Sequence, residues 1–161
     1  MVGLPGRGER LTDPRPEGSA SGLPVAEFGF PRTDLRRRLV AAILSGDKTA
    51  TAGLLVDHER EGSAPAQLGS RQVVIDEHDR PVAVIEMVEV TVRRMVDVDL
   101  AFARDEGEGF ETVEAWREAH GRFFGSYLAD IRADLGDPDW SLDDDTQIVC
   151  ERFRLVNRLE G

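Results

Sequence analysis

The sequence predicts an α+β fold, with about five strands in a small β-barrel that helices flank. Two segments rich in valine and isoleucine, 72–76 and 81–92, have the length and composition of strands. Segments with apolar residues three and four positions apart lie before and after them, as in amphipathic helices. Strands and helices do not alternate regularly, which argues against a parallel βαβ sheet. A chain of 161 residues suffices for one domain with a proper core.

Residues 1–31 are expected to form a disordered tail. They hold five of the eight prolines and few large apolar residues, so burial would not offset the entropy lost on ordering them. Arg7, Arg10 and Arg15 are balanced by acidic residues, so this segment is not a basic arm for nucleic acid. The folded domain is then expected to comprise residues 32–161.

The first helix is expected to begin at Thr33 or Asp34, since either side chain can cap it. Its apolar residues repeat at helical spacing as far as Leu44, and Gly46 is well placed to end it. We expect an extended segment at 49–51 to follow, and then a short helix at 54–61.

The second half of the chain is expected to hold a hairpin, a short helix, a long aromatic helix and a last strand. In order, these are strand 72–76, the turn 77–80, strand 81–92, a helix from Asp97 or Asp99 to about Glu106, the aromatic helix ending near Gly136, and strand 147–156. The aromatic helix has the strongest helical pattern of the chain, carried by Trp116, His120, Phe123, Phe124, Tyr127, Leu128 and Ile131.

Lys48 is the only lysine among the 20 basic residues, and the others are arginines. A desolvated lysine can lose its proton near neutral pH, whereas an arginine stays protonated. Lys48 also precedes Thr51 by three positions, so it is a candidate base beside a candidate nucleophile. The alternative is a solvated loop lysine that precedes an ordinary β-branched strand residue.

The segment 104–109 is a second candidate, because two carboxylates alternate there with two glycines. Glycine lets the backbone approach a ligand, and a carboxylate can hold a lysine or move a proton. An ordinary acidic loop at a helix end has the same composition, and spacing alone favours it. His120 on the aromatic helix is, by pattern, more typical of a satisfied core histidine than of a functional group.

No metal or cofactor is predicted from the sequence. His58, His78 and His120 lack ligand spacing, and the acidic run that starts at Asp134 lacks the glycine of a calcium loop. Cys150 is the only cysteine, which excludes an internal disulfide, and it is typical of a small buried apolar residue.

The net charge of −11 argues against long duplex DNA, because phosphate contact relies on clusters of basic residues. A small-molecule nucleoside or a local contact with RNA is easier to reconcile with this charge. No apolar run has the length of a membrane span, and no signal peptide precedes the domain, so a cytoplasmic protein with no membrane partner is expected. The sequence leaves the oligomeric state open.

Several motifs, in this order, resemble those of the ASCH domain family, the activating-signal-cointegrator homology group. The resemblance covers about residues 30–158 and is closest to a longer bacterial branch. The matching segments are Ile43-Leu44-Ser45-Gly46-Asp47-Lys48-Thr49-Ala50-Thr51, Ala103-Arg104-Asp105-Glu106-Gly107-Glu108-Gly109, Trp116-Arg117 with His120 and Phe123-Phe124, and Val149-Cys150-Glu151-Arg152-Phe153.

The resemblance implies a PUA-like β-barrel of about five to six strands whose cleft binds RNA or a nucleoside. Small bacterial members are amidohydrolases that remove the acetyl group from N-acetylated cytidine with a lysine, a threonine and a glutamate. By motif position these residues fall on Lys48, Thr51 and Glu106. The remaining residues expected to contact the ligand are Gly46, Thr49, Gly53, Glu108, Trp116 and His120, with a backbone N–H near Gly53 as a donor to the oxyanion.

The alternatives implied by the family are a non-catalytic RNA-binding module and a ribonuclease. In the RNA-binding hypothesis Lys48 contacts a phosphate, with Arg36, Arg37, Arg38 and Arg71 as neighbours. The amidohydrolase branch is shorter than this chain and lacks both its Glu-Gly-Glu-Gly segment and its tryptophan-bearing helix, so the substrate does not carry over directly.

Overall fold

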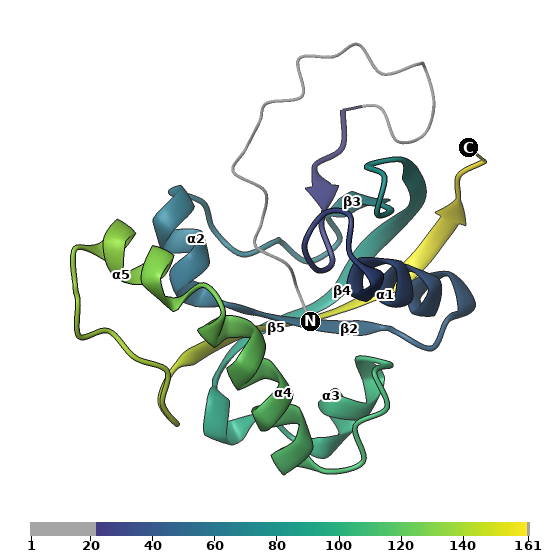
Figure 1. Cartoon of the computed structure of the whole chain (residues 1–161). Helices are drawn as coiled ribbons and strands as arrows, with labels where there is room; N and C mark the ends of the chain where they lie inside the picture. Colours follow the sequence, from purple (N-terminus) through teal and green to yellow (C-terminus); the bar gives the residue numbers. More distant parts are fainter. Residues whose placement is uncertain (1–21, 161) are drawn as a thin grey trace.

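The computed structural model describes residues 22–160, and within them five strands form one mixed sheet. The strands lie in the order β1-β3-β4-β5-β2 (Figure 1). They are β1 (Val25–Ala26), β2 (Ala50–Leu54), β3 (Arg71–Ile75), β4 (Pro81–Arg94) and β5 (Gln147–Arg158). The helices are α1 (Asp34–Ser45), α2 (Leu55–Glu61), the 3₁₀ turn η1 (Met95–Asp97), α3 (Leu100–Asp105), α4 (Val113–Gly125) and α5 (Leu128–Leu135).

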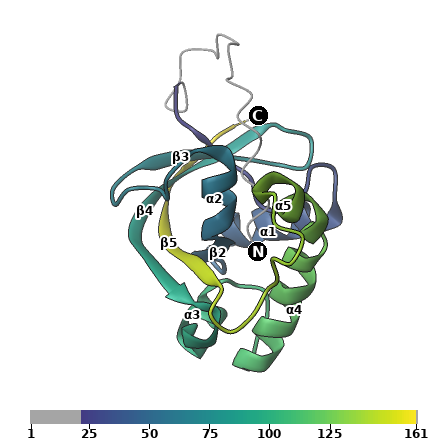
Figure 2. The ribbon, with the colours of Figure 1, turned by 90° about the vertical axis from the view of Figure 1, so that its left-hand side faces the viewer.

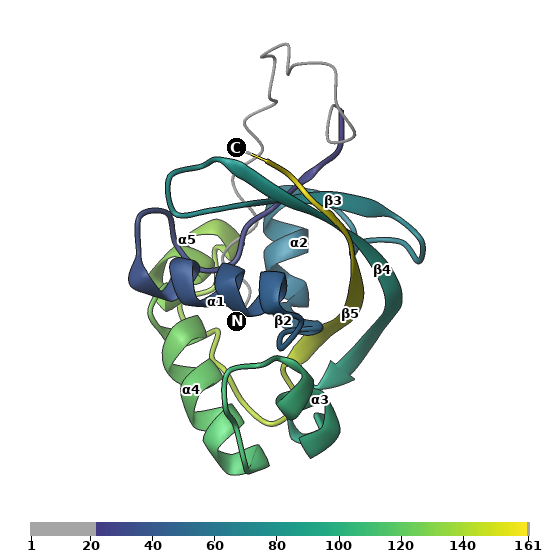
Figure 3. The same ribbon diagram turned by 90° about the vertical axis from the view of Figure 1, so that its right-hand side faces the viewer.

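β4 and β5 are the longest strands and form the antiparallel centre of the sheet. The register between them shifts after Val84 and again between Met87 and Glu89, and such bulges bend a strand. The sheet curls into an open barrel with α1 and α2 on its concave side and α4 and α5 across its open side (Figure 2 and Figure 3). The predicted α+β fold is confirmed.

The two faces of the β2–β5 pair contact different parts of the core. Side chains alternate along a strand, so Ala50 and Ala52 point to one face and Thr51 to the other. The alanines join a cluster with Trp116 and other aromatic residues of α4. Phe153 of β5, two residues beyond Glu151, belongs instead to the cluster that α1 covers.

The structure corrects the predicted boundary of the tail at residue 31. β1 pairs in parallel with β3, and the side chains of Ala26 and Phe28 are buried in the core. Phe28 also lies against Phe153, with ring centroids 5.9 Å apart. Segment 22–31 was mistaken for tail because its few apolar residues complete a core that other elements build. The rest of the predicted tail, residues 1–21, lies outside the described residues.

The predicted aromatic helix is two helices. α4 ends at Gly125, and Ser126 turns its hydroxyl back to the Phe123 carbonyl oxygen at 2.6 Å. Glycine and a back-bonded serine both weaken a helix, which is why the chain breaks here. The break turns Tyr127 so that its hydroxyl donates a hydrogen bond to Asp57 of α2 at 2.7 Å. The apolar spacing continues across the break, which is why the pattern suggested one helix.

No helix in residues 22–160 is both long enough and apolar enough to cross a membrane.

Candidate functional site

Lys48 is buried directly after α1, with 1% of its surface exposed. Gly46 ends the helix in the left-handed conformation (φ 88°), and the Lys48 backbone N–H then donates to the Ala42 carbonyl oxygen at 3.0 Å. This turn directs the side chain inward. Gly46, expected to contact a ligand, is therefore seen here as the residue that ends α1.

The Lys48 ammonium group is surrounded by acceptors. Nζ donates hydrogen bonds to the backbone carbonyl oxygens of Ala50 at 2.8 Å and Glu106 at 3.1 Å. The Glu108 carboxylate lies 3.8 Å away. An ammonium group has three donors, so this surrounding suits a charged, fixed lysine. The solvated loop lysine allowed by the sequence is excluded by this burial.

Loop 106–109 is clamped onto the backbone beside Lys48. Gly107 adopts φ 69°, and a Cβ there would lie 2.5 Å from the Asp47 carbonyl oxygen and 2.7 Å from the Lys48 Cα. The Thr49 N–H donates to the Asp105 carbonyl oxygen at 2.8 Å. Only glycine permits so close an approach, which explains why a glycine separates the two glutamates.

The Glu106 carboxylate faces α4 rather than the lysine ammonium. Trp116 Nε1 donates to its Oε2 at 2.5 Å, and His120 Nε2 lies 3.1 Å from the same oxygen. The other ring nitrogen of His120, Nδ1, lies 2.9 Å from the Trp116 carbonyl oxygen. Both ring nitrogens of His120 thus lie near oxygen atoms.

Two opposing effects act on the pKa of Glu106. Burial raises the pKa of this carboxyl, but the charge and hydrogen bonding of His120, together with Lys48, outweigh burial and hold it below its usual range. Glu106 is therefore a fixed anion. His120, which the spacing assigned to the core, is indeed fully buried, yet it forms an ion pair with Glu106.

Thr51 lies in β2 with 3% of its surface exposed. Its hydroxyl oxygen makes no hydrogen bond with any residue in the described part of the chain. The Ala50 carbonyl that holds Lys48 belongs to the peptide between Ala50 and Thr51, so the ammonium group sits at the backbone of Thr51. The pairing of lysine and threonine side chains that the spacing suggested stays a prediction.

Two other residues expected to contact the ligand have structural partners. Thr49 is exposed, and its hydroxyl lies 3.4 Å from the Asp105 carbonyl oxygen. Gly53 lies in β2 opposite Val149 of β5. Neither placement shows a ligand contact, and the role of each stays a prediction.

Two carboxylates and one imidazole lie close enough together to hold a metal ion. Their spacing along the sequence did not suggest this group. Donor atoms of Glu106, Glu108 and His120 all lie within 4.8 Å of one another. They come from a loop and from α4, so only tertiary structure unites them. The Lys48 ammonium group already lies beside Glu108, and a divalent cation there would be repelled by it.

Three of the four arginines expected beside Lys48 in the RNA-binding hypothesis have partners elsewhere. Arg36 is buried and donates to the Gly29 carbonyl oxygen at 2.8 Å. Arg37 pairs with Asp34 at 3.0 Å, and Arg71 donates to a Glu86 carboxylate oxygen at 3.1 Å. Arg38 is exposed on α1.

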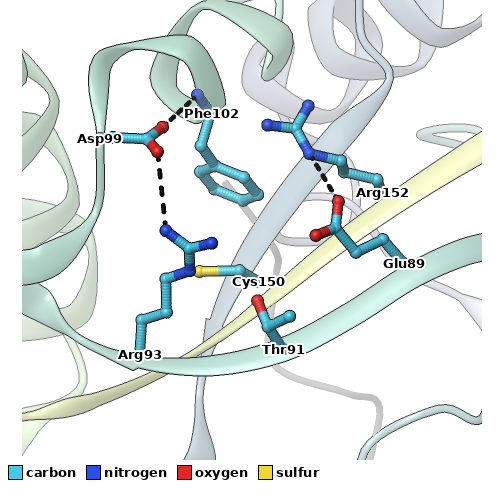
Figure 4. A pocket seen from close by; sticks show the side chains of 7 residues that line it. All are labelled: Glu89, Thr91, Arg93, Asp99, Phe102, Cys150 and Arg152. Carbon is cyan, nitrogen blue, oxygen red and sulfur yellow. Dashed lines mark hydrogen bonds and ion pairs between the residues drawn. The ribbon is translucent and has the colours of Figure 1, made fainter.

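A shallow pocket lies on the face of β5 that carries Cys150 and Arg152, opposite the face that carries Phe153 (Figure 4). It is lined by Glu89, Thr91, Arg93, Asp99, Phe102, Cys150 and Arg152. Its arginines are paired with carboxylates, Arg152 with Glu89 at 3.0 Å and Arg93 with Asp99 at 3.6 Å. Burial raises the pKa of the Cys150 thiol to about 12, so the pocket offers no ready nucleophile.

Sequence reasoning missed two side chains near the site. The Phe28 ring centroid lies 6.0 Å from Lys48 Nζ, but this residue fell in the predicted tail. Glu151 lies opposite Thr51 across the β2–β5 ladder. A carboxylate directly after the apolar run 148–150 was the signal that could have singled it out.

Comparisons with known proteins agree with the fold. The family model described as ASCH domain matches residues 26–157. Protein EF3133 from Enterococcus faecalis V583 superposes with a TM-score of 0.72 at 29% identity, covering 82% of this chain and 75% of that one. An ASCH domain from Lactobacillus crispatus JV V101 superposes with a TM-score of 0.69 at 28% identity, covering 82% and 78%. No curated protein matches.

Proposed function

The chain belongs to the ASCH domain family, with its PUA-like α+β fold, and from this premise we propose that it is an amidohydrolase. Its substrate would be a nucleoside acylated on an exocyclic nitrogen, such as N-acetylcytidine. The observation that carries the proposal is the buried lysine, held at the backbone of Thr51 and beside a carboxylate. A buried charge is costly unless it is paired, as Lys48 is with Glu108. The buried Thr51 hydroxyl has no hydrogen-bond partner in residues 22–160, so it is available to a substrate.

In the first half of the reaction, Thr51 is the nucleophile and Lys48 is the base. Transfer of a proton from Lys48 to Glu108 gives a neutral amine and a neutral acid. The Thr51 oxygen then attacks the acyl carbon while its proton passes to Lys48, whose ammonium charge stabilises the oxyanion. Collapse breaks the C–N bond, and Glu108 protonates the leaving amine.

In the second half, water hydrolyses the acyl-threonine. Glu108 takes one proton of the water while the water oxygen attacks the acyl carbon. The bond between the acyl carbon and the Thr51 oxygen then breaks, Lys48 returns its proton to that oxygen, and the carboxylic acid leaves, which restores the neutral amine and the neutral acid. Glu108 takes the role that motif position gave to Glu106, because its carboxylate lies nearer the ammonium group. Glu106 then acts as a positioning residue, through its backbone carbonyl on Lys48.

The test is hydrolysis of N-acetylcytidine, followed by chromatography, with the wild type and two variants. We expect Lys48→Arg and Thr51→Ala each to lose about 10²–10⁴-fold in kcat. Matched controls are Arg38→Lys on the exposed face of α1 and Thr91→Ala on β4, which should keep wild-type rates.

Two outcomes would contradict the proposal. Turnover that survives Lys48→Arg would show that Lys48 is not the base, because arginine cannot accept the proton. A wild-type protein that leaves N-acetylcytidine and other N-acylated nucleosides intact would reject the amidohydrolase.

A further inference from the structure

Glu151 lies directly opposite Thr51 in the antiparallel ladder of β2 and β5. Residues opposite one another in such a ladder point to the same face, with Cβ atoms about 4.5–5.5 Å apart. The Glu151 carboxyl is therefore on the face of the sheet to which the Thr51 hydroxyl points. None of the steps proposed for the reaction uses it.

Glu151 makes no hydrogen bond or ion pair with any of residues 22–160, and it is half-buried. An isolated carboxyl in such a place is costly unless something outside the chain pairs with it. Its side chain remains partly exposed, so a ligand can reach it.

Two aromatic rings connect Glu151 with Lys48. Phe153, two residues along β5, lies on the same face as Glu151. Its ring packs against Phe28 at 5.9 Å, and the Phe28 ring lies 6.0 Å from Lys48 Nζ. Thr51 and Glu151 therefore share one face of the sheet, and the two rings lie between this face and the Lys48 ammonium group.

The strands beside Glu151 bring no charge to its face. Its ladder partner on β4 is Val90, as Thr51 is on β2. The adjacent charged residues, Glu89 and Arg152, point to the other face and pair with each other at 3.0 Å.

Several charged groups of the helices packed on β5 have partners elsewhere. On α1, Arg36 donates to Gly29 and Arg37 pairs with Asp34. On α2, Asp57 pairs with Arg60 at 2.8 Å. The remaining titratable groups on these helices are Arg38, His58, Glu59 and Glu61. Glu61 has to be separated from Glu151 by experiment, because burial and the neighbouring Asp57 raise its pKa to about 7 as well.

We propose that Glu151 is the specificity residue of this site and that, in its protonated form, it hydrogen-bonds the ring edge of the acylated base. This inference rests on the proposed function. A neutral carboxyl presents an O–H donor beside a C=O acceptor. That pair complements a ring nitrogen beside an N–H group, which is the edge that N-acetylcytidine keeps next to its acyl group. A carboxylate has only acceptors and would face the lone pair of the ring nitrogen.

The protonation state agrees with this role. Burial raises the pKa of Glu151 to about 7, so the neutral form is well populated at neutral pH. Ligand affinity should then be full below pH 7 and fall as the carboxyl ionises above it, by about tenfold per pH unit.

The test measures kcat and KM for N-acetylcytidine between pH 6 and 8.5. For the wild type we expect KM to rise above pH 7. Glu151→Gln keeps a neutral donor–acceptor pair, so its KM should stay near the wild-type pH 6 value at every pH. Glu151→Ala should raise KM about 10- to 100-fold at pH 6, because the ring edge loses its partner, with kcat within a few-fold. Glu61→Gln is the control and should keep the wild-type pH profile.

Several results would overturn the inference. These are a wild-type KM that does not change with pH, an unchanged KM in Glu151→Ala, a pH dependence that vanishes in Glu61→Gln, and a Glu151→Gln variant that loses kcat at unchanged KM. The last would make Glu151 a base. Circular dichroism and thermal melts establish that each variant is folded.

A calorimetric titration of cytidine at pH 6 and 8.5 separates this inference from the proposed reaction. An inactive wild type that binds cytidine with the expected dependence on pH and on Glu151 would reject the hydrolase and support the recognition role. A wild type that binds no cytidine would overturn the recognition role.

Discussion

At the scale of single residues, the site is a set of buried charges that satisfy one another. Lys48 is held by two carbonyl oxygens and faces Glu108, while Glu106 is held by Trp116 and His120. Buried charges of this kind persist only when they are paired. Glu151 departs from this pattern because it has no partner among residues 22–160.

Glu106→Gln should destabilise the fold by about 3–5 kcal/mol, because it leaves the buried His120 without its anion. The free energy of unfolding from urea titrations measures this. Glu118→Gln, on the exposed face of the same helix where it pairs with Arg122, should cost less than about 1 kcal/mol. Equal costs for the two variants would show that the buried pair contributes no more than a surface one.

Glu151→Gln should stabilise the protein above pH 7. The folded-state pKa of Glu151 is raised to about 7, so the folded chain binds more protons than the unfolded chain between about pH 4.5 and 7, and stability falls over that window. The amide does not ionise, so it avoids this loss. The free energy of unfolding of the variant minus that of the wild type should therefore be about 1–3 kcal/mol larger at pH 8 than at pH 4. Urea titrations at both pH values measure this, and a gain that does not depend on pH would contradict it.

At the scale of elements, the decisive contact is between two loops. The turn after α1 and the segment after α3 meet at Gly107, whose missing side chain lets the two backbones touch. Lys48 owes one of its two carbonyl acceptors to this contact, since the Glu106 carbonyl oxygen comes from the second loop. The short α3 thus delivers acidic residues to a lysine that lies more than fifty positions earlier in the chain.

Gly107→Ala should therefore damage both stability and activity. Its Cβ would overlap the Asp47 carbonyl, and its φ of 69° is unfavourable for alanine, so we expect a loss of about 2–4 kcal/mol and of most turnover. Gly109→Ala is the matched control, because φ is 84° there but nothing lies within 4 Å of the new Cβ. It should cost about 1 kcal/mol. Similar losses in both variants, measured by urea titration, would show that strain alone matters.

Phe28→Ala should cost about 3–5 kcal/mol, because the ring is 2% exposed and packs on Phe153. The size of this effect tests whether the segment before α1 belongs to the domain. Val92→Ala, at a β4 position that is 46% exposed, should change the free energy of unfolding by less than about 0.5 kcal/mol. If Phe28→Ala were as stable as Val92→Ala, the segment before α1 would not contribute to the core of the domain.

At the scale of the whole molecule, charge sets the class of partner. The chain carries a net charge of −11, and Arg36 and Arg71 are paired away from Lys48. A nucleoside carries no phosphate, so it meets little repulsion from this surface.

We expect weak RNA binding that vanishes at physiological salt. Titration of a labelled single-stranded RNA at 50 and 200 mM salt measures this, and the slope of log K against log salt counts the phosphates contacted. A micromolar or tighter affinity, with a slope that corresponds to several phosphate contacts, would contradict the expectation and favour the RNA-binding module.

The sequence alone determined the features that rest on local physics. Thr33 and Gly46 bound α1 as predicted, and runs of valine and isoleucine marked β3 and β4. The lone lysine drew attention to Lys48, which the structure buries beside the start of β2. These signals are short-range, because capping, strand propensity and the reach of one side chain involve neighbouring residues.

Tertiary structure decided which distant groups meet. It seated Phe28 in the core and turned Tyr127 toward Asp57. It also gave the lysine the carboxylate of Glu108 rather than that of Glu106, because α4 places Trp116 and His120 on the latter. Spacing along the chain cannot rank two glutamates on one loop. Their roles depend on which of them the helix packed against that loop engages, and that is a property of the folded chain.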